Sequence, residues 1–164
     1  MTELVRLTLA ERIPDAGSTV TIDADAAECI AIAARLLLPA VASLRCRWRL
    51  VRGQKGLVEA EGLLQAEVTQ ECGITLEPFA ATVAEMFTIH FVMAGRESED
   101  TLDPDEPDEL VYDGVTLDLG EATVEQLALA LDPYPRKPGA VLADELDGPA
   151  ENAFAALARL RRPE

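Results

Sequence analysis

Three stretches between residues 41 and 93 alternate apolar with polar side chains, with a period of two residues. The first runs from Val41 to Val51, the second from Val58 to Thr69, and the third from Pro78 to Met93. Successive side chains of a β-strand point to opposite faces of its sheet, so this alternation is typical of a strand buried on one face. The sequence therefore predicts three long antiparallel strands and argues against an all-helical or a parallel α/β fold.

The turn-like sequence RGQKG between the first two stretches predicts a hairpin. The apolar faces of its strands match only in every second register, because a one-residue slip would turn one strand inside out. The register that we expect places Arg47 opposite Glu61 and Arg49 opposite Glu59.

Helical spacing of apolar residues appears at three places. A first helix begins at Asp25, where a capping-box pattern precedes the apolar positions, and ends before Pro39. A second begins at Thr123 and ends before Pro133, and a third spans residues 151–162.

Two short stretches, Leu4 to Leu9 and Thr19 to Ile22, have strand character, and the turn residues Pro14 and Gly17 lie between them. We expect them to form a first hairpin. The elements together predict an α+β fold, a mainly antiparallel sheet curled into an open barrel, with one helix after the first hairpin and two C-terminal helices. The length of 164 residues fits one domain, so we expect residues 1–164 to form a single domain.

The chain is strongly acidic, with 30 Asp and Glu residues against 14 Lys and Arg residues and a net charge of −16. This charge repels phosphate backbones, so it disfavours DNA and bulk nucleic-acid binding and favours a basic partner. Nine of the acids lie in residues 97–113, which contain no Lys or Arg. We expect that run to be a mobile acidic loop.

The chain has no stretch of 18 consecutive apolar residues, and its N-terminus lacks an apolar core long enough for a signal peptide. Its three cysteines, an odd number without a close pair, suit reduced thiols. We therefore expect a cytoplasmic protein that does not enter a membrane.

The sequence offers little for catalysis or metal binding. His90, the single histidine, has no nucleophile or orienting acid in a recognisable motif around it. The cysteines lack the paired spacing of a zinc site, and no phosphate-binding loop is present. We expect no catalytic residue, no metal and no cofactor.

Two basic features stand out against the acidic background, and the first lies on the first long strand. Arg45, Arg47 and Arg49 share its polar face, where they can either bind phosphates or pair with Glu59 and Glu61 of the next strand. We favour the pairing, because both Glu residues lie on the same face.

The second basic feature is LALDPYPRKPGA, residues 129–140, which sets Tyr134, Arg136 and Lys137 among three prolines. Prolines fix the backbone, so such a segment suits the presentation of side chains to a partner at low entropic cost. The alternative is a segment laid over the core to close the fold, with Tyr134 packed. The sequence leaves both open.

Three segments carry a resemblance to a known family. They are QECGITLEPF (70–79), DLGEATVEQLALALDPYPRKPGA (118–140) and NAFAALARL (152–160). In sequence, order and spacing they resemble the YceD family, the bacterial large ribosomal RNA subunit accumulation proteins. The family implies no catalytic residues. Some branches have paired cysteines that look metal-binding, but Thr69 takes the place of the first here and only Cys72 remains, so zinc is not expected.

The resemblance implies a non-enzymatic factor that supports large-subunit ribosomal RNA accumulation or ribosome assembly. Its partner would be a ribosomal protein, the pre-ribosomal large subunit or rRNA itself. Two other functions remain open: an acidic protein-binding adaptor unrelated to ribosomes, and a hydrolase of RNA maturation.

Overall fold

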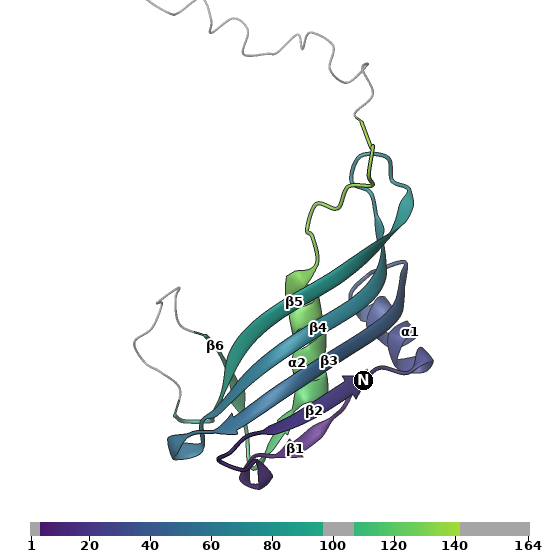
Figure 1. The fold of residues 1–164 in the computed structure, drawn as a ribbon. Helices are drawn as coiled ribbons and strands as arrows, with labels where there is room; N and C mark the ends of the chain where they lie inside the picture. Colours follow the sequence, from purple (N-terminus) through teal and green to yellow (C-terminus); the bar gives the residue numbers. More distant parts are fainter. Residues whose placement is uncertain (1–3, 97–106, 142–164) are drawn as a thin grey trace, which may run out of the picture.

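The computed structural model describes residues 4–96 and 107–141 (Figure 1). These residues form an α+β fold with two short 3-10 turns, η1 (Ala10–Arg12) and η2 (Gln54–Gly56). The strands and helices in chain order are β1 (Leu7–Leu9), β2 (Ser18–Asp23), α1 (Ala26–Arg35), β3 (Ala40–Arg52), β4 (Val58–Glu71), β5 (Pro78–Met93), β6 (Asp108–Tyr112), β7 (Thr116–Asp118) and α2 (Leu119–Ala130). Neither helix of the described residues is long and apolar enough to cross a membrane.

The main sheet has five strands in the order β2-β3-β4-β5-β6, and β1 pairs with β7 in a separate two-stranded sheet. All pairings are antiparallel except that between β5 and β6. The long β3, β4 and β5 confirm the strands predicted from the alternation. Among the described residues no pairing joins β2 to β6, so the sheet is open and its curl into a barrel is not confirmed.

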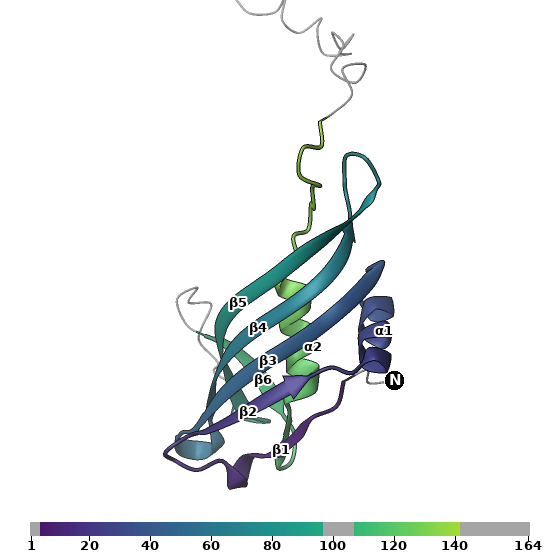
Figure 2. The ribbon, with the colours of Figure 1, turned by 45° about the vertical axis from the view of Figure 1, so that its right-hand side comes forward.

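The core lies between one face of the main sheet and α2, which crosses behind the sheet in both views (Figures 1 and 2). Trp48 of β3 is fully buried there, and its Nε1 donates to Thr123 Oγ1 of α2 at 3.0 Å. The Phe87 ring meets the Trp48 ring edge-on at a centroid distance of 5.0 Å. Gly62 makes room for it, since a Cβ there would lie 2.1 Å from Phe87 Cζ.

Both helices begin at an aspartate cap. Asp25 and Glu28 form the expected capping box of α1, each accepting the other's backbone N–H at 2.9 Å. The cap of α2 is Asp118 rather than Thr123, so that prediction was wrong by about one turn. Asp118 Oδ1 accepts from the backbone N–H groups of Gly120, Glu121 and also Arg6, which fixes the N-terminal segment to the start of α2.

The register of the β3–β4 hairpin differs from the predicted one by two residues. Arg47 lies opposite Leu63, and Arg49 lies opposite Glu61. The loop, which contains η2, spans residues 53–57 instead of the expected 52–56, and Lys55 within it takes a positive φ of 57°. A two-residue shift preserves the faces, so the predicted burial pattern holds although the predicted pairs do not.

Two further predictions need correction. The first hairpin does not form, because β1 pairs with β7 and β2 pairs with β3. Residues 108–112, which lie within the predicted acidic loop, form the strand β6. Tyr112 points inwards and holds this strand in place, because its hydroxyl donates a hydrogen bond to Gly56 O at 2.6 Å. The predicted helix at 151–162 and residues 97–106 of the acidic run lie outside the described residues.

Candidate functional site

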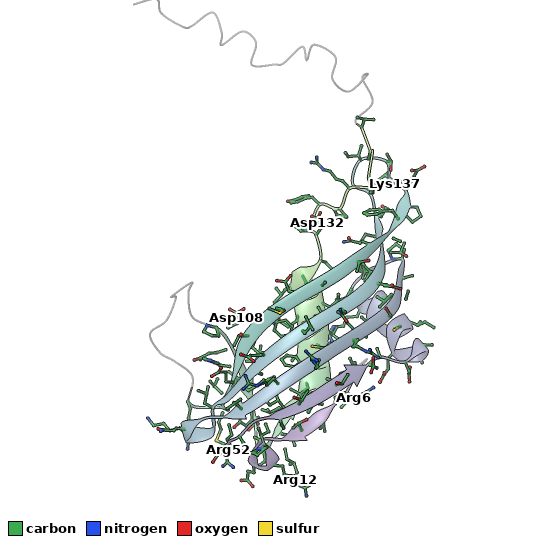
Figure 3. All side chains as sticks on the ribbon, in the orientation of Figure 1. Arg6, Arg12, Arg52, Asp108, Asp132 and Lys137 are labelled. Atoms are coloured by element: carbon green, nitrogen blue, oxygen red, sulfur yellow. The ribbon has the colours of Figure 1, made fainter. Side chains whose placement is uncertain are left out.

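The Pro-rich segment, residues 132–140, runs from the end of α2 towards the loop between β4 and β5 (Figure 3). Asp132 fixes its start in two ways. The carboxylate accepts a hydrogen bond from Tyr134 N at 2.8 Å, and the backbone carbonyl accepts one from Gln70 Nε2 at 3.2 Å. Gln70 is a buried side chain of β4, so the segment is attached to the sheet where it leaves the helix.

The β4–β5 loop, residues 72–77, holds the middle of the segment. Gly73 N donates to Pro135 O at 2.9 Å, and Lys137 N donates to Cys72 Sγ at 3.3 Å. The Lys137 ammonium group also donates to Glu77 Oε2 at 2.9 Å. We call these three contacts the clamp. Because prolines fix φ between the attachment points, the clamp sets the course of the backbone.

Two acidic groups at the clamp, the Cys72 thiol and the Glu77 carboxyl, have lowered pKa values. Hydrogen bonds from the Thr75 hydroxyl and then from Lys137 N, which favour the thiolate, lower the pKa of Cys72 to about 6. The hydrogen bond from Lys137, with its positive charge, lowers the pKa of the Glu77 carboxyl. The Glu77 carboxylate is therefore a charged partner for Lys137 at neutral pH.

The side chains of the Pro-rich segment differ in exposure. Tyr134 is 79% exposed, so the alternative in which it packs on the core is wrong. Arg136 is also exposed and has no ion pair among the described residues, whereas Lys137 is engaged by Glu77. The arrangement holds a rigid backbone and leaves Tyr134 and Arg136 in solvent; their contact with a partner stays a prediction.

The arginine face of β3 lies on the side of the sheet away from α2. Arg45 pairs with Asp23 of β2, and Arg49 pairs with Glu61 of β4 at 3.0 Å. Arg47 has no ion pair within residues 4–96 and 107–141. Only Arg49 pairs with one of the two glutamates that we favoured, whereas the partner of Arg45 is Asp23 of β2, which we did not expect. Their role in binding remains untested.

A hollow of about 560 Å³ lies on this same face, beside Arg47 and Arg49. Its lining includes the apolar side chains of Leu63 and Met86, and Met86 is 78% exposed. Our reading of the sequence did not single out this hollow. The sequence did contain one signal for it. Met86 is an apolar residue at an even position of β5, and mainly the odd positions of this strand face the core.

Among the described residues, His90 does not lie in a catalytic or metal-binding cluster. It lies on β5 opposite Glu59 and is half-buried. Among the residues that the structure describes, no group of three His, Cys, Asp or Glu side chains is placed to hold a metal ion. The clamp therefore remains the most organised candidate site.

Comparison with known proteins gives one match. The family model for "Large ribosomal RNA subunit accumulation protein YceD" matches residues 60–160. That range begins within β4 and includes the β4–β5 loop, α2 and the Pro-rich segment, so both sides of the clamp lie inside it. No curated protein matches the chain, and no solved structure does.

Proposed function

The chain belongs to the YceD family, and from this premise we propose that it is a non-enzymatic cytoplasmic factor that supports accumulation of large-subunit ribosomal RNA. It acts by binding a ribosomal protein, the pre-ribosomal large subunit or rRNA. The Pro-rich segment is the contact, with Tyr134 and Arg136 as its outward side chains.

The clamp is the observation that supports this contact most directly. A loop that served only to connect α2 to the rest of the chain would not need backbone hydrogen bonds at both Pro135 and Lys137. Because the backbone is already ordered, binding through Tyr134 and Arg136 loses little conformational entropy. Tyr and Arg are also the side chains that most often dominate binding energy at protein interfaces.

A deletion strain provides the test. Loss of the gene should lower large-subunit rRNA relative to small-subunit rRNA, and the wild-type gene should restore it. A variant with Tyr134→Ala and Arg136→Ala should fold but fail to restore it, because its substitutions remove exposed side chains only. Arg12→Ala is the matched control, since Arg12 is an exposed arginine at the opposite end of the molecule from Lys137 (Figure 3).

Two results would overturn the proposal at different levels. Unchanged rRNA in the deletion strain would remove the function. Full restoration by the Tyr134/Arg136 variant would remove the Pro-rich segment as the contact and leave the function in place.

A further inference from the structure

β5 has a free edge over much of its length. Its register with β4 runs unbroken from Pro78 to Phe91, whereas β6 pairs only with Ile89 to Met93. Among the described residues, positions 78–88 have no strand on the side away from β4 and make no backbone hydrogen bond beyond the β4 ladder. This edge therefore presents a row of unpaired N–H and C=O groups.

Natural sheets usually protect such edges with lysines, prolines or bulges. After Pro78, the stretch to Thr88 contains no lysine and no further proline, and its register shows no bulge. Its one charged side chain is Glu85. The edge is therefore open to pairing with another strand.

A hollow of about 330 Å³ runs along this edge. One wall includes five consecutive residues of β5, from Ala81 to Glu85, and the other includes Asp132, Pro135 and Arg136. Consecutive side chains of a strand point to opposite faces, so a hollow that touches all five reaches the edge of β5; it also extends to Gln70 of β4. The clamp thus holds the Pro-rich segment beside the edge without covering it.

The charges around the edge are mainly negative. Glu85 and Asp132 line the hollow together with Arg136, and Asp108 lies where β6 begins (Figure 3). The whole chain carries a net charge of −16. This potential attracts basic peptides and repels the phosphates of RNA.

We propose that the free edge of β5 binds an extended basic segment of a partner protein as an added strand. This inference rests on the proposed function and narrows its partner to a protein. Backbone hydrogen bonds provide the affinity, and alternate side chains provide the selectivity. Basic side chains on one face of the added strand approach Glu85, and apolar ones on the other face approach Ala84 and Met86.

The test is hydrogen–deuterium exchange of the full chain, read over residues 78–88. The probe is a synthetic peptide of about ten residues that alternates Lys and Val. We expect it to slow exchange of the outward amides of this stretch by about tenfold or more at saturation. The comparison probes are a Lys/Pro peptide, which cannot complete a ladder, a Glu/Val peptide and a single-stranded RNA oligonucleotide; none of them should protect the edge.

A pair of lysine substitutions separates the edge from the sheet face. Ala84→Lys places a charged side chain on the face where the apolar side chains of the added strand approach β5, and lysines on an edge strand oppose pairing, so it should weaken binding of the Lys/Val peptide by about tenfold or more. Gln65→Lys is the matched control, because Gln65 is exposed, lies directly opposite Ala84 on β4 and adds the same charge one strand away from the edge. It should retain most of the affinity.

Several results would overturn the inference. One is that the Lys/Val peptide leaves exchange at residues 78–88 unchanged, and another is that the Lys/Pro peptide or RNA slows it equally. A third is that the two lysine variants lose equal affinity for the Lys/Val peptide, and a fourth is that the amides of residues 78–88 are already protected without any probe. Protection that depends on protein concentration alone would assign the edge to a second copy of the chain and would also overturn it.

The deletion strain distinguishes this failure from failure of the proposed function. If deletion lowers large-subunit rRNA but Ala84→Lys restores it fully, the edge is not used and the function stands. If deletion leaves rRNA unchanged, the proposed function fails whatever the peptide does.

Discussion

Substitution of Gly62 by alanine should destabilise the fold through one identified collision. The new Cβ would lie 2.1, 2.6 and 2.7 Å from three atoms of the Phe87 ring. Non-bonded carbon atoms approach to about 3.5–4.0 Å, so the ring must move by more than about 1 Å. The ring cannot move freely, because it packs edge-on against the fully buried Trp48.

The expected cost follows from three contributions. Overpacking a core costs about 1–3 kcal/mol, and the disturbed aromatic pair costs about 0.5–1.5 kcal/mol. Replacing glycine by alanine within a strand returns about 0.5–1 kcal/mol. Gly62→Ala should therefore lower the free energy of unfolding by about 2 kcal/mol.

Urea unfolding followed by fluorescence measures this loss, because Trp48 is the only tryptophan and touches the Phe87 ring. A loss of about 2 kcal/mol lowers the midpoint by about 1 M when the slope is about 2 kcal/mol/M. Phe87→Leu serves as the second arm of a double-mutant cycle, since it removes the ring that the Cβ meets. In that background Gly62→Ala should cost about 0.5 kcal/mol or less. Additive losses in the double variant would refute the collision as the cause.

Three further predictions concern single contacts. Thr123→Val leaves the indole N–H of Trp48 without its acceptor and should cost about 1–3 kcal/mol in urea unfolding, whereas Thr123→Ser should cost less; equal losses would contradict the hydrogen bond. The pKa of the Cys72 thiol is lowered to about 6 from 9.0. The free energy of unfolding of wild type, relative to Cys72→Ala, should therefore include its full pH-dependent gain above pH 9 and lose that gain as the pH falls towards 6. Parallel pH curves for the two proteins would contradict this. Arg49→Ala should lower the free energy of unfolding by about 0–1 kcal/mol, and Arg47→Ala should not change it measurably. Neither substitution should change RNA affinity. A salt dependence of RNA binding that is flattened by about 0.7–0.9 log unit per lost contact would instead identify phosphate binding.

The long strands could be predicted because each carries the period-two signal over more than ten residues. The hairpin register could not be predicted from the same signal, since any even shift preserves the buried face. The loop decides the register, and there Lys55 takes a positive φ that a lysine does not indicate in a sequence.

β6 was missed because its pattern is short and surrounded by charge. Within its five residues only Leu110 and Tyr112 turn inwards, where they lie beside Phe91 and Met93 in the parallel register. Two inward side chains among acidic neighbours do not stand out from a solvated loop. Only the tertiary pairing with β5 makes them a strand.

The candidate site could be predicted in part. The prolines and cations marked the Pro-rich segment, but its attachment depends on residues far away in the chain, with Gln70 and Asp132 being 62 positions apart. The free edge of β5 was also not predicted, because it results from the unequal lengths of β5 and β6. Pairing partners determine edges, and one strand's sequence does not show which of its residues lack a partner.

The attachment of the N-terminal segment to Asp118 has a consequence for how the chain is made. Arg6 and Asp118 are 112 positions apart, and the β1–β7 pairing joins the same two regions. Translation at about 5–20 residues per second separates their emergence from the ribosome by roughly 5–20 s. During that interval β1 has no strand to pair with and the cap of α2 does not yet exist. The main sheet up to β5 can form first, and the N-terminal segment joins it late, as α2 closes over the core.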